Sequence, residues 1–144
     1  MDLKENKVLY VKRKLIPFSE YLPHPLLNDL FDRVNANTLK SNIQAGKPKQ
    51  TAINIQGMSM SPVICYEALF TALIDPSAQI ILNLGNESWF QSDIVSNMML
   101  AINISRAIEH NTPILRVTDK GLSGYYDPQT HAFLKAKNNS SQQF

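Results

Sequence analysis

The sequence has one cysteine, little net charge and no long hydrophobic run. A single cysteine, Cys65, cannot form a disulfide within the chain, so the fold has to rest on packing. The net charge is only +2 and the lysines are scattered, which argues against a nucleic-acid partner. No stretch approaches the ~18 apolar residues that cross a bilayer, and residues 1–7 lack the apolar core of a signal peptide. These absences predict a soluble or peripheral protein.

What is present is the composition of one globular domain. The chain has 144 residues, of which 44% are hydrophobic and 18% charged, and this length leaves no room for a second domain. We expect the domain to span residues 1–134 and a polar tail to follow at residues 135–144.

Apolar residues recur at two different spacings along the chain. Short β-prone runs predict strands at 8–11, 53–55, 63–64, 80–84, 114–117, 122–126 and 132–134. Helical spacing and good helix formers predict helices at 26–34, 67–74 and 94–108, and the segment 17–23 should be a loop. Strands that alternate with helices indicate an α/β fold with helices packed on a sheet.

Two of these elements carry more specific expectations. The uninterrupted apolar run at 80–84 is typical of a strand covered on both faces. The helix at 94–108 should be capped by Ser92 or Asp93 and should end near Asn111, ahead of a proline. Its buried face should consist of Ile94, Met98, Ala101, Ile102, Ser105 and Ile108.

Cys65 lies where a predicted strand meets a predicted helix. Val63 and Ile64 run directly into it, and good helix formers follow from Glu67. At such a turn the helix dipole and unpaired N–H groups favour a thiolate, the form of cysteine that acts as a nucleophile. A lone cysteine is more often a small buried hydrophobe, so this position alone leaves its role open.

Other site chemistries find little support. The three histidines, His24, His110 and His131, are far apart and lack the cysteine or acidic spacing of a metal site. The sequence contains no glycine-rich phosphate loop and no G-x-S-x-G motif. We therefore expect neither a metal nor another cofactor.

Four separated blocks of the sequence occur together in one known family. They are Tyr10-Val11-Lys12-Arg13-Lys14-Leu15-Ile16-Pro17-Phe18-Ser19-Glu20-Tyr21-Leu22-Pro23, Ile64-Cys65-Tyr66-Glu67, Asn86-Glu87-Ser88-Trp89-Phe90, and Pro113-Ile114-Leu115-Arg116 followed by Gly121. In this order they resemble the later part of the catalytic domain of the apolipoprotein N-acyltransferases, a family of the nitrilase (carbon-nitrogen hydrolase) superfamily. The resemblance runs from about residue 8 to 127 and implies part of an αββα sandwich.

The resemblance also implies roles for individual residues. Cys65 would be the nucleophile and Lys12 its cationic partner in a triad of Glu, Lys and Cys. Glu20 and Glu67 match acidic positions that support the lysine and the site, although either could be a loop or helix-start carboxylate. Positions that flank the pocket are matched by Tyr66, Asn86 and Trp89. An aromatic residue such as Trp89 can equally be plain core.

Some positions depart from the family pattern or stay open. Arg116 matches a family arginine, but a structural ion pair explains it equally well. Glu87 stands where aspartate is usual, and Asp119-Lys120 replaces an asparagine-rich pair. The family's general-base glutamate precedes the lysine, and no matching motif precedes Lys12. The chain therefore resembles a fragment, a truncated product, or one piece of a two-chain assembly. Its partner would be the missing N-terminal half or a second copy of itself.

By resemblance, the reaction would move a fatty acyl group from a phospholipid to the N-terminal amine of a lipoprotein or to another amine, through a thioester on Cys65. The setting would be the periplasmic face of a bacterial inner membrane. The alternatives are an amidase-like or nitrilase-like hydrolase, a nitrilase homologue associated with conjugal transfer, and a non-catalytic remnant without the general base. Sheet faces left open by a missing half would favour poor solubility or dimerisation.

Overall fold

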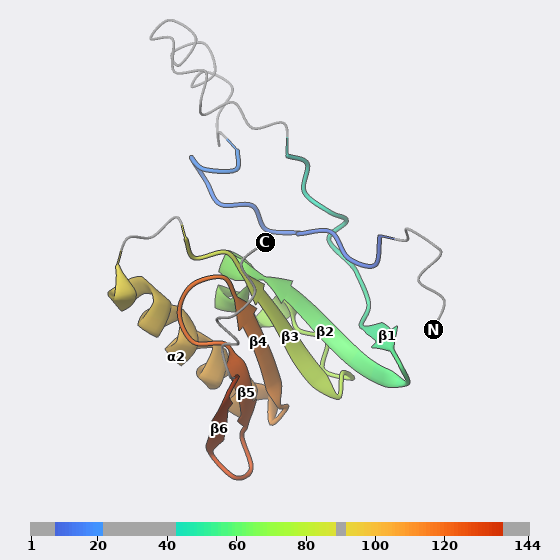
Figure 1. Cartoon of the computed structure of the whole chain (residues 1–144). Helices are drawn as coiled ribbons and strands as arrows, with labels where there is room; N and C mark the ends of the chain where they lie inside the picture. The colour runs from blue at the N-terminus through green and yellow to red at the C-terminus, as the bar shows by residue number, and fades with distance from the viewer. Residues whose placement is uncertain (1–7, 22–42, 89–91, 137–144) are drawn as a thin grey trace, which may run out of the picture. The chain divides into compact units, whose positions relative to one another are not determined.

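The computed structural model describes residues 8–21, 43–88 and 92–136. The chain divides into two compact units, Met1–Gln50 and Thr51–Phe144. Every strand and helix within the described residues belongs to the unit Thr51–Phe144 (Figure 1). The helix predicted at 26–34 and most of the predicted tail lie outside the described residues.

Six strands form one mixed sheet whose spatial order follows the sequence. They are β1 (Ile53–Ile55), β2 (Met58–Ile64), β3 (Ile80–Gly85), β4 (Ile114–Thr118), β5 (Gly124–Asp127) and β6 (Ala132–Lys135). The three central strands β2, β3 and β4 pair in parallel, and the outer pairs are antiparallel. The predicted α/β fold is confirmed, and the strand predicted at 122–126 begins later, at Gly124.

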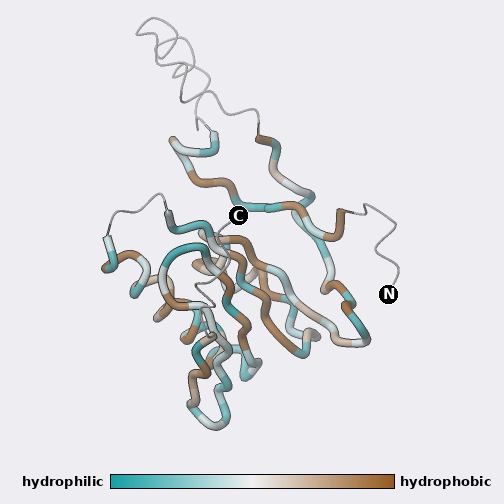
Figure 2. Tube along the Cα trace, viewed as in Figure 1, coloured by the Kyte–Doolittle hydropathy of each residue, from teal (hydrophilic) through white to brown (hydrophobic). Residues whose placement is uncertain are grey.

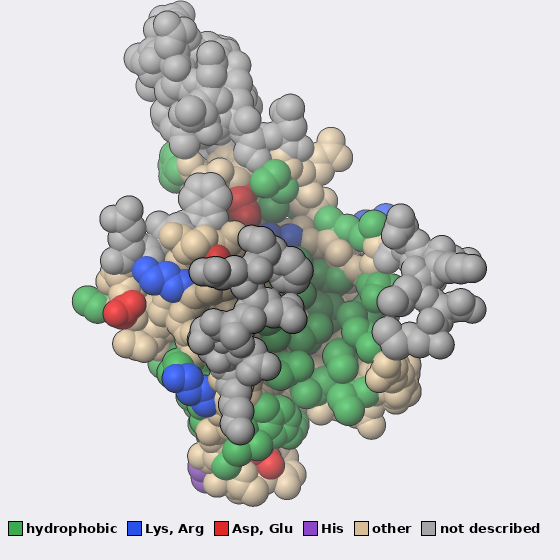
Figure 3. All heavy atoms as spheres, viewed as in Figure 1, with side chains coloured by type: hydrophobic (Ala, Val, Ile, Leu, Met, Phe, Trp, Pro, Cys, Tyr) green, Lys and Arg blue, Asp and Glu red, His purple; other side chains and the backbone are tan. Residues whose placement is uncertain are grey.

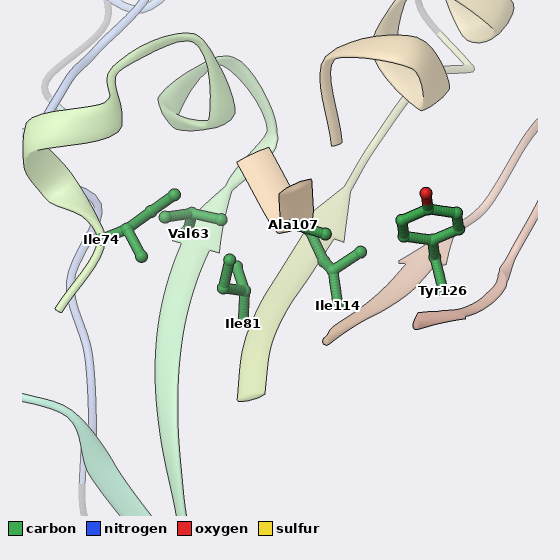
Figure 4. Close-up of a cluster of buried hydrophobic side chains, with 6 residues drawn as sticks. All are labelled: Val63, Ile74, Ile81, Ala107, Ile114 and Tyr126. Atoms are coloured by element: carbon green, nitrogen blue, oxygen red, sulfur yellow. The ribbon is translucent and has the colours of Figure 1, made fainter. Parts of the chain in front are cut away.

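One face of this sheet carries the hydrophobic core. The buried cluster consists of Val63, Ile74, Ile81, Ala107, Ile114 and Tyr126. Because side chains alternate across a strand, the pairing register places Ile81, Ile114 and Tyr126 in one row on the same face. Figure 4 shows these side chains directed to the same side of neighbouring strands. Burial of apolar side chains from four strands and a helix therefore fixes this half of the fold.

The helix α2 (Asp93–His110) covers that face and has the predicted ends. The hydroxyl of Ser92 accepts the N–H of Ile94 at 3.3 Å, which satisfies one unpaired donor of the first turn. Asn111 ends the helix in the left-handed conformation with φ of 48°, where its N–H pairs with carbonyls of the last turn. Capping by residues on either side therefore sets the length of α2.

The face that α2 buries is not the predicted one. The predicted apolar face is mostly exposed, since Ile94, Met98, Ala101, Ser105 and Ile108 lie at the surface. The buried residues are Ser96, Asn103 and Ala107. The alanine packs in the core cluster on the sheet. The side-chain NH2 of Asn103 donates to the carbonyl of Met99 within the helix at 2.7 Å. Apolar spacing alone could not identify this face.

The segment after β2 is not the α-helix predicted at 67–74. It forms two short 3-10 helices, η2 (Cys65–Leu69) and η3 (Thr71–Leu73), on either side of Phe70. The N–H of Phe70 bonds to the carbonyl of Glu67, and the ring of Phe70 packs edge-on against Tyr66 with centroids 5.2 Å apart. Bonds of this i to i+3 type do not continue into a longer helix. The expected support of a thiolate by an α-helix dipole is therefore wrong.

The unit Met1–Gln50 is irregular at its described residues, 8–21 and 43–50. The strand predicted at 8–11 does not form. Instead, the N–H and C=O of Val11 pair with the side-chain amide of Gln50 at 3.0 and 2.7 Å, so one side chain takes the place of a neighbouring strand. The Lys12 carbonyl accepts the N–H of Gly46 at 2.7 Å. An added Cβ at Gly46 would lie 2.5 Å from the Val11 carbonyl oxygen, so this approach requires glycine.

The second face of the sheet is apolar and is left open by the described elements of its own unit. The register places Leu84 beside Val117 on this face, and they are 42% and 47% exposed. Hydrophobic residues follow β2 and β3 in Figure 2, and Figure 3 shows hydrophobic side chains gathered over these strands. The prediction that residues 80–84 are covered on both faces is confirmed at Ile80 and Ile81, which point to opposite faces and are both buried, and it is wrong at Leu84.

Candidate active site

The candidate site residues of the unit Thr51–Phe144 follow the carboxyl ends of its parallel strands. Cys65 comes directly after β2, Asn86 directly after β3, and Asp119 directly after β4. Because β2, β3 and β4 run in the same direction, these three ends meet at one edge of the sheet (Figure 1). Crevices at this edge are where open α/β sheets bind ligands.

Cys65 has an unusual backbone conformation for a residue with a side chain. Its φ is 49°, in the left-handed region that non-glycine residues rarely adopt. The side chain is half-buried, and its Sγ lies 3.9 Å from the carbonyl oxygen of Asn86, which accepts the weak thiol hydrogen bond. Backbone strain of this kind costs roughly 1–3 kcal/mol and clusters at functional sites. Cys65 is thus not the small core residue that a lone cysteine usually is.

Glu67 and Tyr66 lie next to Cys65 but turn to other partners. The Glu67 side chain is fully buried, and its carboxylate accepts the N–H of Ile64 at 2.8 Å. It therefore holds the start of η2 against the end of β2, as a helix-start carboxylate does. The Tyr66 ring packs against Phe70. A direct role for Glu67 or Tyr66 in the chemistry remains a prediction.

Lys12 and Glu20 form an ion pair within the unit Met1–Gln50. Both carboxylate oxygens of Glu20 lie 2.7 Å from the Lys12 Nζ, and one of them also accepts the N–H of Ile16 at 2.7 Å. The turn at residues 17–20 brings the two side chains together, and the predicted loop is confirmed as far as Tyr21. The approach of the Lys12 ammonium to Cys65, which belongs to the other unit, remains a prediction.

Arg116 of β4 and Glu87, in the segment that follows β3, form a buried ion pair. Arg116 and Glu87 are each 1% exposed, and the guanidinium donates to the Glu87 carboxylate. Arg116 also donates to Asn83 at 3.3 Å and to the carbonyl of Leu122 at 3.0 Å. The structural ion pair proposed for Arg116 is therefore confirmed. The signal for it in the sequence was one charged residue inside the apolar strand 114–117.

Asp119 was not singled out as a site residue from the sequence, yet it contacts the same segment. Its carboxylate accepts the N–H of Glu87 at 2.6 Å and that of Ser88 at 3.3 Å. The N–H of Lys120 also donates to it at 2.8 Å. Its position directly after a buried strand was a signal, but its partners are 32 and 31 positions away in the sequence.

These contacts make the charge state of Asp119 a predicted source of acid sensitivity. The hydrogen bond from the Glu87 backbone, and those from Ser88 and Lys120, lower the pKa of Asp119 from 3.8 to about 2. A depressed carboxylate pKa stabilises the fold fully above 3.8, and this contribution is lost as the pH falls through about 2. We expect the stability difference between wild type and Asp119→Asn to follow this course in denaturant unfolding at several pH values. A difference that persisted below that range would contradict it.

Other predicted residues lie elsewhere. Trp89 and His24 are outside the described residues. His110 contacts Thr71 at 2.7 Å, and His131 contacts Tyr126 at 3.2 Å. No cluster of three or more acidic, histidine or cysteine side chains within the described ranges could hold a metal ion. None of the helices in those same ranges combines the length and apolarity that crossing a bilayer requires.

Relatives with similar sequences share one description. The chain is 32% identical over 129 residues to the apolipoprotein N-acyltransferase of Pseudomonas aeruginosa. This match covers 86% of the chain and 25% of that protein. It is 34% identical over 124 residues to the apolipoprotein N-acyltransferase of Caulobacter vibrioides, covering 83% of this chain and 23% of that protein. The chain therefore spans about a quarter of the length of these relatives. No family model matches it.

Solved structures with a similar fold include a carbon-nitrogen hydrolase and an amidase. A carbon-nitrogen hydrolase from Helicobacter pylori G27 superposes with a TM-score of 0.56 at 15% identity, over 65% of this chain and 41% of that one. An amidase variant from Nesterenkonia sp. AN1, with acrylamide added at its active-site cysteine, gives 0.53 at 17% identity over 69% and 42%. The chain is thus a homologue of a quarter-length segment of apolipoprotein N-acyltransferases and has the fold of the carbon-nitrogen hydrolases.

Proposed function

We propose that this chain supplies the nucleophile of an acyl-transfer reaction and that Cys65 accepts the acyl group. The observation that carries the proposal is the position of Cys65, half-buried and in a left-handed conformation at the carboxyl edge of three parallel strands. Relatives that are acyltransferases support this role, as does a fold shared with an amidase whose active-site cysteine is reactive.

The proposed reaction has two steps. The Cys65 thiolate attacks the carbonyl carbon of an ester, the C–O bond breaks, and the released alkoxide takes up a proton. An amine then attacks the resulting thioester, the C–S bond breaks, and an amide and the thiolate are formed while the amine loses a proton. Lys12, held by Glu20, would supply a positive charge beside the tetrahedral oxyanion.

The proposed substrates follow from the resemblance to the apolipoprotein N-acyltransferases. A phospholipid would supply the acyl group, and the N-terminal amine of a lipoprotein, or another amine, would accept it. The site would then work at a membrane surface, by resemblance the periplasmic face of a bacterial inner membrane. By resemblance, a general base outside the matched segment would accelerate both steps by about 10²- to 10⁴-fold, so the chain alone is expected to react more slowly than a complete enzyme.

Phospholipid vesicles and an N-terminal peptide amine test this proposal directly. We expect mass spectrometry of the intact chain to detect one acyl group on Cys65 after incubation with the vesicles, and the addition of the peptide to remove it as a peptide amide. Release of free fatty acid at the same rate with and without the peptide would instead identify the amidase-like alternative, which the carbon-nitrogen hydrolase fold also supports. No adduct under any condition would favour the non-catalytic remnant.

The open sheet face bears on the proposed partner, either a missing N-terminal half or a second copy. We expect the isolated chain to self-associate through this face, since exposed apolar strand residues drive such contacts. Replacing Leu84 and Val117 together with lysine should weaken association by about tenfold or more in sedimentation experiments. The control is Ile94→Lys, which changes a residue that is 70% exposed on α2 instead. A wild-type chain that sediments as a stable monomer would contradict this expectation.

A further inference from the structure

Glu87, in the segment after β3, is held through both its side chain and its backbone. The Glu87 carboxylate accepts a hydrogen bond from the buried guanidinium of Arg116, and the Glu87 backbone N–H donates to the Asp119 carboxylate. Gly121, with φ of 88°, also packs on Glu87, because an added Cβ there would lie 3.0 Å from the Glu87 Oε2. The residues after β4 therefore fix the segment that follows β3.

The Glu87 N–H belongs to the same peptide group as the Asn86 carbonyl. The described chain contains no cis peptide bond, so this N–H and C=O point in opposite directions across one plane. On one side the N–H donates to Asp119 at 2.6 Å, and on the other side the carbonyl oxygen lies 3.9 Å from the Cys65 Sγ. A constraint on the N–H is therefore also a constraint on the group that faces the sulfur.

We infer that Asp119 is a positioning residue: it fixes the plane of the Asn86–Glu87 peptide and thereby the direction from which the Asn86 carbonyl contacts the Cys65 thiol. The inference rests on the proposed role of Cys65. Without Asp119 this peptide can rotate, because no other described hydrogen bond holds the Glu87 N–H. The sulfur then loses a fixed neighbour, and reactions that need a nucleophile placed to within a fraction of an ångström slow down.

Asp119 is itself held in place, which makes it suited to this role. Its Oδ1 accepts the N–H of Lys120 at 2.8 Å. The Thr118 hydroxyl bonds to the Lys120 carbonyl at 2.8 Å, and the Thr118 N–H bonds to the Ser123 hydroxyl at 3.0 Å. These contacts make a tight turn directly after β4, so the carboxylate is anchored to the strand that neighbours β3.

The test is acylation of the full chain by a p-nitrophenyl ester of a short fatty acid, followed as release of nitrophenolate. We expect Asp119→Ala to lower the acylation rate at saturating ester by about tenfold while leaving the half-saturating ester concentration unchanged, since the variant misplaces the nucleophile without changing binding. Asp119→Asn keeps an amide oxygen that can accept the Glu87 N–H and should stay within about threefold of wild type. The control is Asp127→Ala, which removes a similar aspartate contact, to the Gln129 N–H at 2.8 Å, in the turn between β5 and β6.

A second readout does not depend on activity. In Asp119→Ala, but not in Asp127→Ala, the NMR signals of the Glu87 amide and of the Cys65 Cβ should shift while the remaining signals stay those of the folded chain. If wild type is not acylated and these shifts occur, the proposed function fails and the positioning role stands. If wild type is acylated and Asp119→Ala matches it in rate and in both signals, the positioning role is overturned. A rate loss that only follows a loss of folded chain overturns it as well.

Discussion

Replacing Cys65 with serine is expected to abolish acyl-enzyme formation, with a loss of about a thousandfold or more in the rate of ester-dependent acylation. The substitution exchanges one atom and keeps the side-chain shape, so the left-handed turn after β2 should persist. A serine hydroxyl is a weak nucleophile until a base removes its proton, whereas a thiol is partly ionised near neutral pH. Chemistry that depends on Cys65 should therefore not survive the exchange.

The measurement is the mass of the intact chain after incubation with an activated ester. Wild type should gain one acyl group, which hydroxylamine removes as expected for a thioester, and Cys65→Ser should gain none. Wild type blocked beforehand with iodoacetamide is the matched control, because Cys65 is the only cysteine in the sequence. An adduct that persisted in Cys65→Ser, or one that hydroxylamine did not remove, would assign acylation to another residue.

Glu87→Gln should lower the free energy of unfolding by about 3 kcal/mol, a large part of the stability of a domain of this size. The substitution keeps the side-chain volume but removes the negative charge opposite Arg116, and both side chains are 1% exposed. A guanidinium left without its counter-ion in the interior keeps its desolvation cost and loses its compensation. Strand β4, which carries Arg116, should be destabilised with it.

A matched substitution elsewhere separates burial from charge. Glu109 bonds to Arg106 at 2.8 Å but is 42% exposed, so Glu109→Gln should change stability by no more than about 0.5 kcal/mol. Denaturant unfolding followed by circular dichroism measures both variants under the same conditions. Equal effects of the two substitutions would show that the Arg116–Glu87 pair contributes no more to stability than a surface pair.

Much of the fold could be predicted from local sequence patterns. Alternating and continuous apolar runs located β1, β3 and β4, because the spacing of apolar side chains along a strand shows which of its faces are covered. Ser92 and Asn111 marked the ends of α2, since capping depends on neighbours in the sequence. The buried face of α2 could not be predicted in this way. Packing on the core cluster buries Ala107, and Ser96 is buried beside Gly121, which lies in the loop after β4.

The strand predicted at 8–11 and the helix predicted at 67–74 were wrong because side chains there take the place of backbone partners or redirect the backbone. At 8–11 the amide of Gln50 satisfies Val11, and its partner lies 39 positions away, beyond any local pattern. At 67–74 the Glu67 carboxylate and the packing of Phe70 favour short 3-10 turns over a continuous helix. In both segments the sequence has suitable propensities, and specific contacts overrule them.

The site was predictable only in part for a similar reason. Cys65 could be placed at a strand end because the strand precedes it directly, and the Lys12–Glu20 pair lies only 8 positions apart. The contacts of Asp119 with Glu87 depend on β3 and β4 being neighbours in the sheet, which no local pattern reveals. Residues that hold a site from adjacent strands are therefore found from topology and not from motifs.

We propose that a cationic Lys12 acts on the Cys65 sulfur, and the rate of alkylation of Cys65 by iodoacetamide at neutral pH tests this proposal most directly. A nearby ammonium favours the thiolate, so Lys12→Ala should lower this rate by about tenfold. Lys49→Ala, which removes the same charge from an exposed position of the same unit, should leave the rate at the wild-type value. Equal rates for wild type and Lys12→Ala would contradict the account.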